Sequence, residues 1–263
     1  MVDFKYIIRR LTFSFELDGF FSKKKYFIQE LLNLASDYQP KGIQRVVWNG
    51  PKGKLVLNFY DSLGCFRAEI VDLKMLDIEL KNKKDPTIVD IGSNQGFSVL
   101  WFKYNYPGAK IHAYEPVKKS FNILEKNVLD NNLKDCVLNN SGVSDKDKTA
   151  IIFHHSGGAG LGDNLFINSG GDEEEQIKLV NLDSKFDSID LLKLDAEGSE
   201  YSILKNCVFW KKADKIIIEF HDHLKPDNVD YKSLIKNAGF KLDKKVGEGT
   251  VYVYYFSKRD INE

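Results

Sequence analysis

The segment Ile88-Val89-Asp90-Ile91-Gly92-Ser93-Asn94-Gln95-Gly96 decides the fold class. A short apolar run, Thr87 to Ile91, leads into a glycine-containing turn, and Phe97 to Tyr106 follows as an almost wholly apolar helix that Pro107-Gly108 stops. Glycine lets the backbone approach a ligand closely, and the free N–H groups at a helix start can receive a carboxylate or a phosphate. A simple turn that needs glycine for its backbone angle would show the same pattern, so the rest of the chain must decide between the two.

Strand and helix patterns alternate after this segment. Short apolar runs predict strands, and apolar residues at helical spacing predict the helices between them. The strands are expected at 110–114, 136–138, 149–155, 177–182, 189–195, 215–221, 241–246 and 250–257, and the helices at 116–128, 199–210 and 231–238. Such alternation implies parallel strands with right-handed crossovers, and Gly247-Glu248-Gly249 makes the last two strands a hairpin. We therefore expect residues 85–263 to form a Rossmann-like, doubly wound α/β domain whose seven-stranded, mostly parallel sheet ends in an antiparallel hairpin.

Residues 1–84 are expected to form an N-terminal extension. Residues 1–40 have a mostly helical pattern, and the β-prone runs 43–48 and 54–60 flank Gly50-Pro51-Lys52-Gly53, which predicts a hairpin. Residues 64–80 fit either a strand or a short helix.

Composition narrows the function classes. Lys+Arg and Asp+Glu both total 38, and this balance argues against a nucleic-acid partner. Cys65, Cys136 and Cys207 are far apart and form no CxxC pair, which favours free thiols in a reducing cytoplasm. Charged residues interrupt every apolar stretch before it reaches the length that a membrane-spanning helix needs, so we expect no membrane span.

Glu115 points to a nucleoside-containing cofactor. It follows the second predicted strand, 25 positions after Asp90. In the dinucleotide fingerprint an acidic residue about 20 positions on accepts the ribose hydroxyls; a solvent-facing carboxylate near a helix start is the simpler reading. The NAD pattern is G-x-G-x-x-G, and Asn94 here replaces its second glycine. Asp90 before the turn suits a cofactor whose methionine part is cationic.

Two further strand ends carry ionisable residues. Lys193-Leu-Asp195-Ala-Glu197-Gly-Ser-Glu200 and Glu219-Phe-His221-Asp-His223 follow successive predicted strands. Carboxylates buried near a sheet are costly unless they are used or paired. His221 fits a general base or a metal ligand, whereas His223 is more simply a surface residue.

These segments together resemble the FkbM-like methyltransferases. The resemblance rests on residues 88–98, Tyr114-Glu-Pro116, Asn140-Ser-Gly142, residues 192–200 and Ile218-Glu-Phe-His221, in this order. It covers the chain from about residue 85 onward. It implies a fold similar to class I S-adenosylmethionine-dependent methyltransferases, and O-methylation of a hydroxyl on a small molecule, a natural product or a glycan.

The resemblance also implies residue roles. The expected cofactor-binding residues are Asp90, Gly92, Ser93, Asn94 and Gly96 at the methionine end, Glu115 with Pro116 at the ribose, Ser141 near the adenine, and Asp195. Asp195 would also face the acceptor, and Glu197, Glu219 and His221 would line the acceptor side. Either His221 or Asp195 would serve as the base.

Several alternatives stay open at this point. Asp195 and Glu219 could instead bind a divalent metal that polarises the hydroxyl, although no metal site is assigned. An NAD-dependent oxidoreductase or a sugar-nucleotide enzyme would share the first strand and Glu115. A non-catalytic cofactor-binding module would keep the cofactor residues alone.

Overall fold

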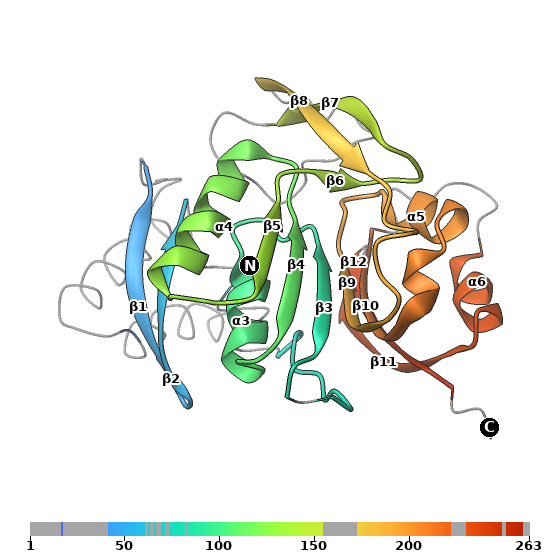
Figure 1. Ribbon diagram of the computed structural model, residues 1–263, viewed down its shortest axis with the longest axis horizontal. Coiled ribbons are helices and arrows are strands. Elements are labelled where there is room, and N and C mark those ends of the chain that lie inside the picture. The colour runs from blue at the N-terminus through green and yellow to red at the C-terminus, as the bar shows by residue number, and fades with distance from the viewer. Residues whose placement is uncertain are drawn as a thin grey trace.

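The computed structural model describes residues 17, 42–60, 63, 66, 70–71, 74–82, 84–154, 173–221, 230–248 and 251–259 (Figure 1). The strands are β1 (Gln44–Gly50), β2 (Gly53–Phe59), β3 (Thr87–Ile91), β4 (Lys110–Tyr114), β5 (Cys136–Asn139), β6 (Gly142–Val143), β7 (Lys148–His154), β8 (Glu173–Val180), β9 (Ile189–Leu194), β10 (Ala213–His221), β11 (Phe240–Glu248) and β12 (Val251–Lys258). The helices are α3 (Phe97–Asn105), α4 (Lys118–Asp130), α5 (Glu200–Asn206), α6 (Tyr231–Asn237) and the 3-10 helix η3 (Phe209–Lys212). Within these residues, no helix combines the length and the apolarity that crossing a membrane requires.

The main sheet has seven strands in the described part of the chain, in the order β11-β12-β10-β9-β3-β4-β5. β3, β4, β5, β9 and β10 pair in parallel, and β12 runs antiparallel between β10 and β11. The strand order extends one way from β3 through β5 and the other way from β9 through β10, so it reverses between β3 and β9. Both the doubly wound α/β fold and the terminal antiparallel hairpin are confirmed.

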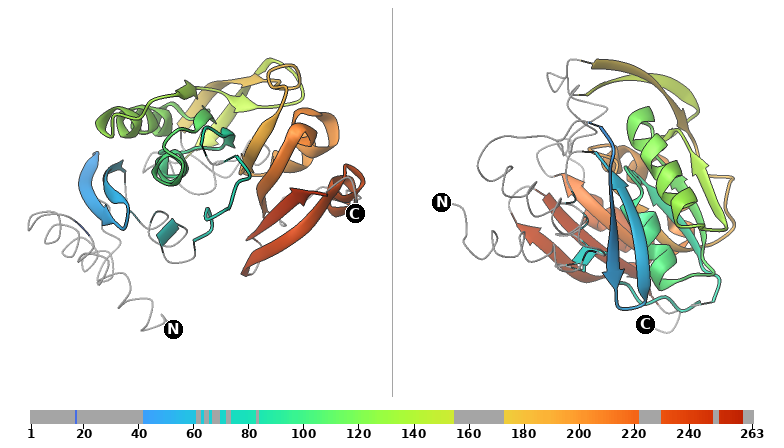
Figure 2. Two further views of the ribbon diagram at one scale, coloured as in Figure 1. Left: turned by 60° about the horizontal axis from the view of Figure 1, so that its bottom comes forward. Right: turned by 90° about the vertical axis from the view of Figure 1, so that its left-hand side faces the viewer.

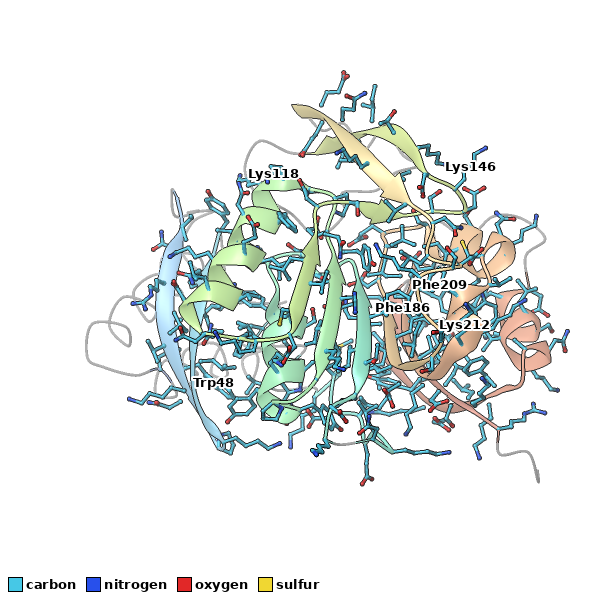
Figure 3. The ribbon with its side chains drawn as sticks, in the orientation of Figure 1. Trp48, Lys118, Lys146, Phe186, Phe209 and Lys212 are labelled. Atoms are coloured by element: carbon cyan, nitrogen blue, oxygen red, sulfur yellow. The ribbon has the colours of Figure 1, made fainter. Side chains whose placement is uncertain are left out.

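Side chains from the two faces of this sheet form two separate cores. Ile88, Leu191 and Ile217 point to the face covered by α3 and α4, where Trp48 of β1 also packs. Val89, Leu192 and Ile218 point to the face covered by α5 and α6, together with Phe209. Figure 3 shows Trp48 and Phe209 on opposite sides of the central strands. Alternation along each strand therefore buries both faces, as expected for a mostly parallel sheet.

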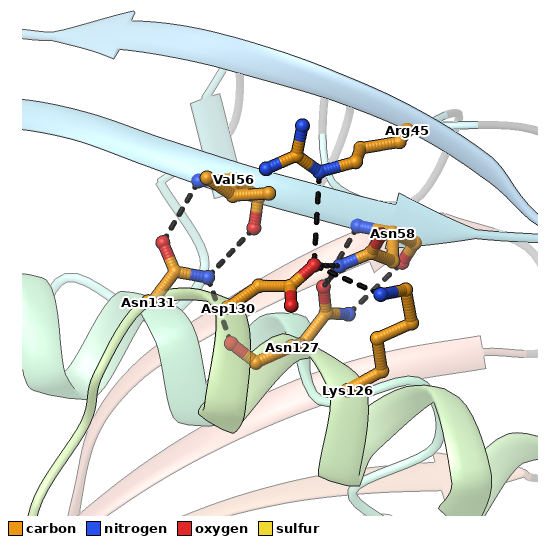
Figure 4. Close-up of polar contacts among 7 residues, drawn as sticks. All are labelled: Arg45, Val56, Asn58, Lys126, Asn127, Asp130 and Asn131. Carbon is orange, nitrogen blue, oxygen red and sulfur yellow. Dashed lines mark hydrogen bonds and ion pairs between the residues drawn. The ribbon is translucent and has the colours of Figure 1, made fainter.

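The predicted hairpin forms between β1 and β2, and asparagines of α4 hold β2, the strand that lies next to this helix. Asn131 of α4 accepts a hydrogen bond from the Val56 N–H at 2.8 Å and donates to the Val56 carbonyl at 2.7 Å. Asn127 does the same for Asn58, at 2.7 Å and 2.9 Å (Figure 4). Each side-chain amide thus replaces a neighbouring peptide group, which closes an edge that would otherwise be open to another strand. Figure 2 shows this hairpin lying outside α4.

The chain between β5 and β9 departs from the predictions. β6, β8 and β7 form a separate three-stranded sheet, of which β6 is too short to be predicted from sequence. β8 already begins in the acidic run, at Glu173, because this run pairs with the end of β7.

Two helix boundaries also differ from the predictions. α5 ends at Asn206, earlier than predicted, and Pro116 lies just before the N-cap of α4 instead of in its first turn. The boundary at residue 84 stays a prediction.

Candidate active site

The turn between β3 and α3 lies where the strand order reverses, next to the carboxyl end of β9. Gly92 has a φ of +75°, and a Cβ placed on it would lie 1.7 Å from the Asp195 carbonyl oxygen. Gly96 has a φ of +84°, and a Cβ placed on it would lie 2.5 Å from Leu124 Cδ1 of α4. Both positions therefore require glycine, and at Gly92 one reason is the close approach of the Asp195 backbone, directly after β9. In doubly wound sheets, ligands bind at this reversal.

Glu115 lies at the end of β4 and holds the same turn. Its two carboxylate oxygens accept hydrogen bonds from the N–H groups of Asn94 and Val117, each at 2.8 Å. Burial raises its pKa to about 7, against the lowering effect of these two bonds and of the charge on Lys193. A carboxylate offers about four acceptor positions, so the two N–H contacts leave acceptor capacity for a ribose hydroxyl.

A buried lysine, to which no sequence motif gives a role, joins the two sides of the reversal. Lys193 of β9 lies beside Asp90 of β3 in the sheet register. Its Nζ lies 3.0 Å from the Gly92 carbonyl oxygen, 3.1 Å from Asp195 Oδ2 and 3.6 Å from Asp90 Oδ1. Burial lowers the pKa of Lys193, but the carboxylates of Asp195, Asp90 and Glu219 raise it by more, so the ammonium stays charged. Strand register brings these groups together, and no local sequence pattern indicates it.

The loop from Asp195 to Glu200 is stabilised by its own last carboxylate. Glu200 is fully buried, and it accepts hydrogen bonds from the N–H groups of Ala196 at 2.6 Å and Gly198 at 2.9 Å. Glu197 adopts a left-handed φ of +47° in the same loop, which is uncommon for a residue with a side chain. Glu200 therefore fixes the loop conformation, a role that its sequence motif does not indicate.

The remaining predicted residues divide into two groups. Ser93, Asn94 and Gly96 belong to the turn, where Ser120 Oγ donates to Asn94 Oδ1 at 3.1 Å. Pro116 and Ser141 follow β4 and β5 at the same edge of the sheet, and Ser141 is buried. On the other side of the reversal, Glu219 lies in β10, close enough for its charge to act on Lys193. His221 ends β10, but its side chain and all of His223 lie outside the described residues.

The donor set fits S-adenosylmethionine. Asp90 is fully buried, and its Oδ1 accepts no hydrogen bond but lies 3.6 Å from Lys193 Nζ. An acidic oxygen with remaining hydrogen-bonding capacity therefore lies beside the turn expected to face the cationic methionine end. Gly92, Ser93, Asn94 and Gly96 would hold that end, and Glu115 would hold the ribose. When bound, this cofactor supplies an electrophilic methyl group. Among the described side chains, none gather into a group of three or more metal-binding residues.

The chain is similar in sequence to two named methyltransferases. Methyltransferase 1 of Beauveria bassiana is 25% identical, over 81% of this chain and 90% of its own. Methyltransferase sdnD of Sordaria araneosa is also 25% identical, over 61% of this chain and 75% of its own. Among solved structures, the Methanococcus jannaschii fibrillarin pre-rRNA processing protein matches with a TM-score of 0.45 at 11% identity, over 83% of this chain and 99% of that one. M. jannaschii TYW2 in complex with AdoMet matches with a TM-score of 0.41 at 9% identity, over 82% and 87%.

The sequence profile described as the Methyltransferase FkbM domain matches residues 90–242, which is more than half of the chain. That match begins at Asp90 and includes the turn, Glu115, the Lys193 cluster and β10. This match favours a methyltransferase over the NAD-dependent oxidoreductase and the sugar-nucleotide enzyme that the sequence left open. The chain belongs to the FkbM methyltransferase family, and S-adenosylmethionine is its methyl donor.

Proposed function

We propose that this protein methylates a hydroxyl oxygen on a small molecule, a natural product or a glycan. The observation that carries the proposal is the set of carboxylates at the carboxyl ends of three adjacent strands. Asp90, Asp195 and Glu219 come from, or directly follow, β3, β9 and β10, beside one another in the sheet. All three interact electrostatically with Lys193.

Acceptor chemistry explains why this arrangement favours an alcohol. An alcohol is a poor nucleophile at neutral pH and benefits from a base within hydrogen-bond reach, whereas a neutral amine already has a nucleophilic lone pair. The segment after β9 reads Asp195-Ala-Glu197-Gly198 and contains no Asn-Pro-Pro-Tyr-type sequence of the kind found in amino-methylating enzymes.

Asp195 is our first candidate for the base. Its side chain is 24% exposed, and Lys193 contacts only Oδ2, which leaves Oδ1 available to the acceptor. His221 is the second candidate, because the ordinary pKa of histidine suits proton transfer near neutrality. Glu197 and Glu219 would line the acceptor side. Much of the remaining rate enhancement would come from holding the acceptor and donor in line.

A matched acceptor screen tests the proposal. Purified protein and methyl-labelled S-adenosylmethionine are incubated with hydroxylated compounds and sugars, and with the corresponding amines and methyl ethers. We expect label in the hydroxylated members only, as a new methoxy group by NMR. Transfer to the amines alone would refute O-methylation. With an acceptor in hand, Asp195→Asn or His221→Ala should lower kcat by about 10²- to 10⁴-fold, and wild-type rates in both variants would refute both base assignments.

A further inference from the structure

We propose that Lys193 is a positioning residue of the methyl-donor site, where it joins the two strand ends and weakens the preference of the site for a positively charged ligand. This inference rests on the proposed placement of the donor beside Asp90 and the glycine turn. It goes beyond that placement, because it concerns which form of the cofactor the site favours.

The joining role follows from the contacts of the ammonium group. Lys193 Nζ donates to the Gly92 carbonyl oxygen at 3.0 Å and to Asp195 Oδ2 at 3.1 Å. Gly92 begins the turn after β3, and Asp195 begins the loop after β9. A single side chain thus sets the separation of the two segments that would face donor and acceptor. The Lys193 side chain is only 11% exposed, so bulk water cannot readily replace these contacts.

The charge role follows from what surrounds the ammonium group. Asp90, Asp195 and Glu219 act on Lys193, and Glu115 also feels the charges of Lys193 and Asp195. Four carboxyl groups therefore face one cation in a partly dehydrated site, where charges interact more strongly than in water. Without Lys193, the site would carry one more uncompensated negative charge.

That balance matters because the donor and the product of methyl transfer differ in charge. S-adenosylmethionine carries a positive sulfonium, and S-adenosylhomocysteine carries an uncharged thioether in its place. A more negative site would bind the donor more tightly relative to the product. Lys193 reduces this difference, so the donor is held less strongly in the state that precedes transfer. Binding energy that stabilises the donor only before transfer does not accelerate the chemical step.

Binding calorimetry tests the inference without any acceptor. The measured quantity is the ratio of the Kd for S-adenosylhomocysteine to the Kd for S-adenosylmethionine, taken at one pH and salt concentration. In Lys193→Met we expect both affinities to fall, because the two segments lose their connection, and the ratio to rise by about fivefold. This factor is what one unit charge contributes at about 8 Å and an effective dielectric constant of about 40.

Matched variants separate charge from structure. Lys193→Arg keeps the charge and should keep the wild-type ratio, even where its larger head weakens both affinities. A purely structural role would lower both affinities by the same factor in Lys193→Met, and an unchanged ratio there would overturn the charge role. If Lys193→Met does not fold, Asp90→Asn is compared with Asp90→Asn/Lys193→Met, because the double variant removes both members of a buried pair. The Kd ratio should rise when Lys193→Met is added to Asp90→Asn, and an unchanged ratio would overturn the inference.

A separate control isolates the underlying proposal. Glu115→Gln should weaken the binding of both ligands, because both contain the ribose. If it leaves both affinities at the wild-type value, the proposed donor site fails. If it weakens both while Lys193→Met leaves the ratio unchanged, only the charge role of Lys193 fails.

Discussion

Replacing Asn127 by alanine should be among the most damaging single changes in the region where the hairpin meets α4. Asn127 is fully buried. It accepts hydrogen bonds from Asn58 N at 2.7 Å and Asn58 Nδ2 at 3.1 Å, and it donates to the carbonyls of Asn58 at 2.9 Å and Gln95 at 2.8 Å. The Asn58 side chain keeps a second partner in Asp130 at 3.0 Å. The truncation therefore leaves three buried backbone groups without partners.

The size of the effect follows from those three groups. An orphaned buried polar group costs about 1–3 kcal/mol, and a water entering the space left by the side chain would recover part of that. We expect Asn127→Ala to lower the free energy of unfolding by about 3–5 kcal/mol. Because Gln95 belongs to the turn after β3, S-adenosylhomocysteine should also bind more weakly.

Asn131→Ala provides the matched control. Asn131 makes the same two contacts one helical turn later, to the N–H and carbonyl of Val56, but both residues are only partly buried, so water can replace the amide. Its cost should be about 1 kcal/mol. Urea unfolding of both variants, followed by circular dichroism, measures the difference. Equal costs would refute the view that the buried amide holds the edge of β2.

Three further changes test the site itself. Gly92→Ala places a Cβ 1.7 Å from the Asp195 carbonyl oxygen, so cofactor affinity should fall at least about tenfold and the melting temperature should drop; unchanged calorimetric binding would contradict this contact. Burial raises the pKa of Glu115 from 4.5 to about 7, so protonation of this carboxyl group contributes stability that is fully present below pH 4.5 and is lost as the pH rises through about 7. Cofactor-free wild-type protein should therefore lose stability relative to Glu115→Gln across that pH interval, and parallel stability curves of the two proteins would exclude the shift. Glu200→Ala leaves the N–H groups of Ala196 and Gly198 without their acceptor, so it should lower the free energy of unfolding in urea by about 2–4 kcal/mol and loosen the loop that carries Asp195. Faster amide exchange confined to residues 195–200 would support that account, and wild-type exchange there would refute it.

The sequence by itself determined the features that depend on neighbouring residues along the chain. Apolar runs of strand length, helical spacing in 117–128 and the turn at 92–96 indicated a doubly wound sheet, because burial on both faces leaves a periodic pattern in the chain. The hairpin around Pro51 and the antiparallel final strand were predictable for the same reason. Their places at the ends of predicted strands singled out Asp90, Glu115 and Asp195, and the family resemblance then implied a role for each.

Only the tertiary structure decided what depends on residues far apart in the chain. Strand register, which no local pattern encodes, places Lys193 beside Asp90, more than a hundred positions earlier. The asparagines of α4 hold β2 because the helix crosses that strand at hydrogen-bonding distance. Glu200 belongs to a motif that suggested chemistry, yet its carboxylate turns into its own loop because the N–H groups of Ala196 and Gly198 need a partner when buried. Local periodicity specifies the elements, whereas the partners of buried charges and amides are chosen by packing.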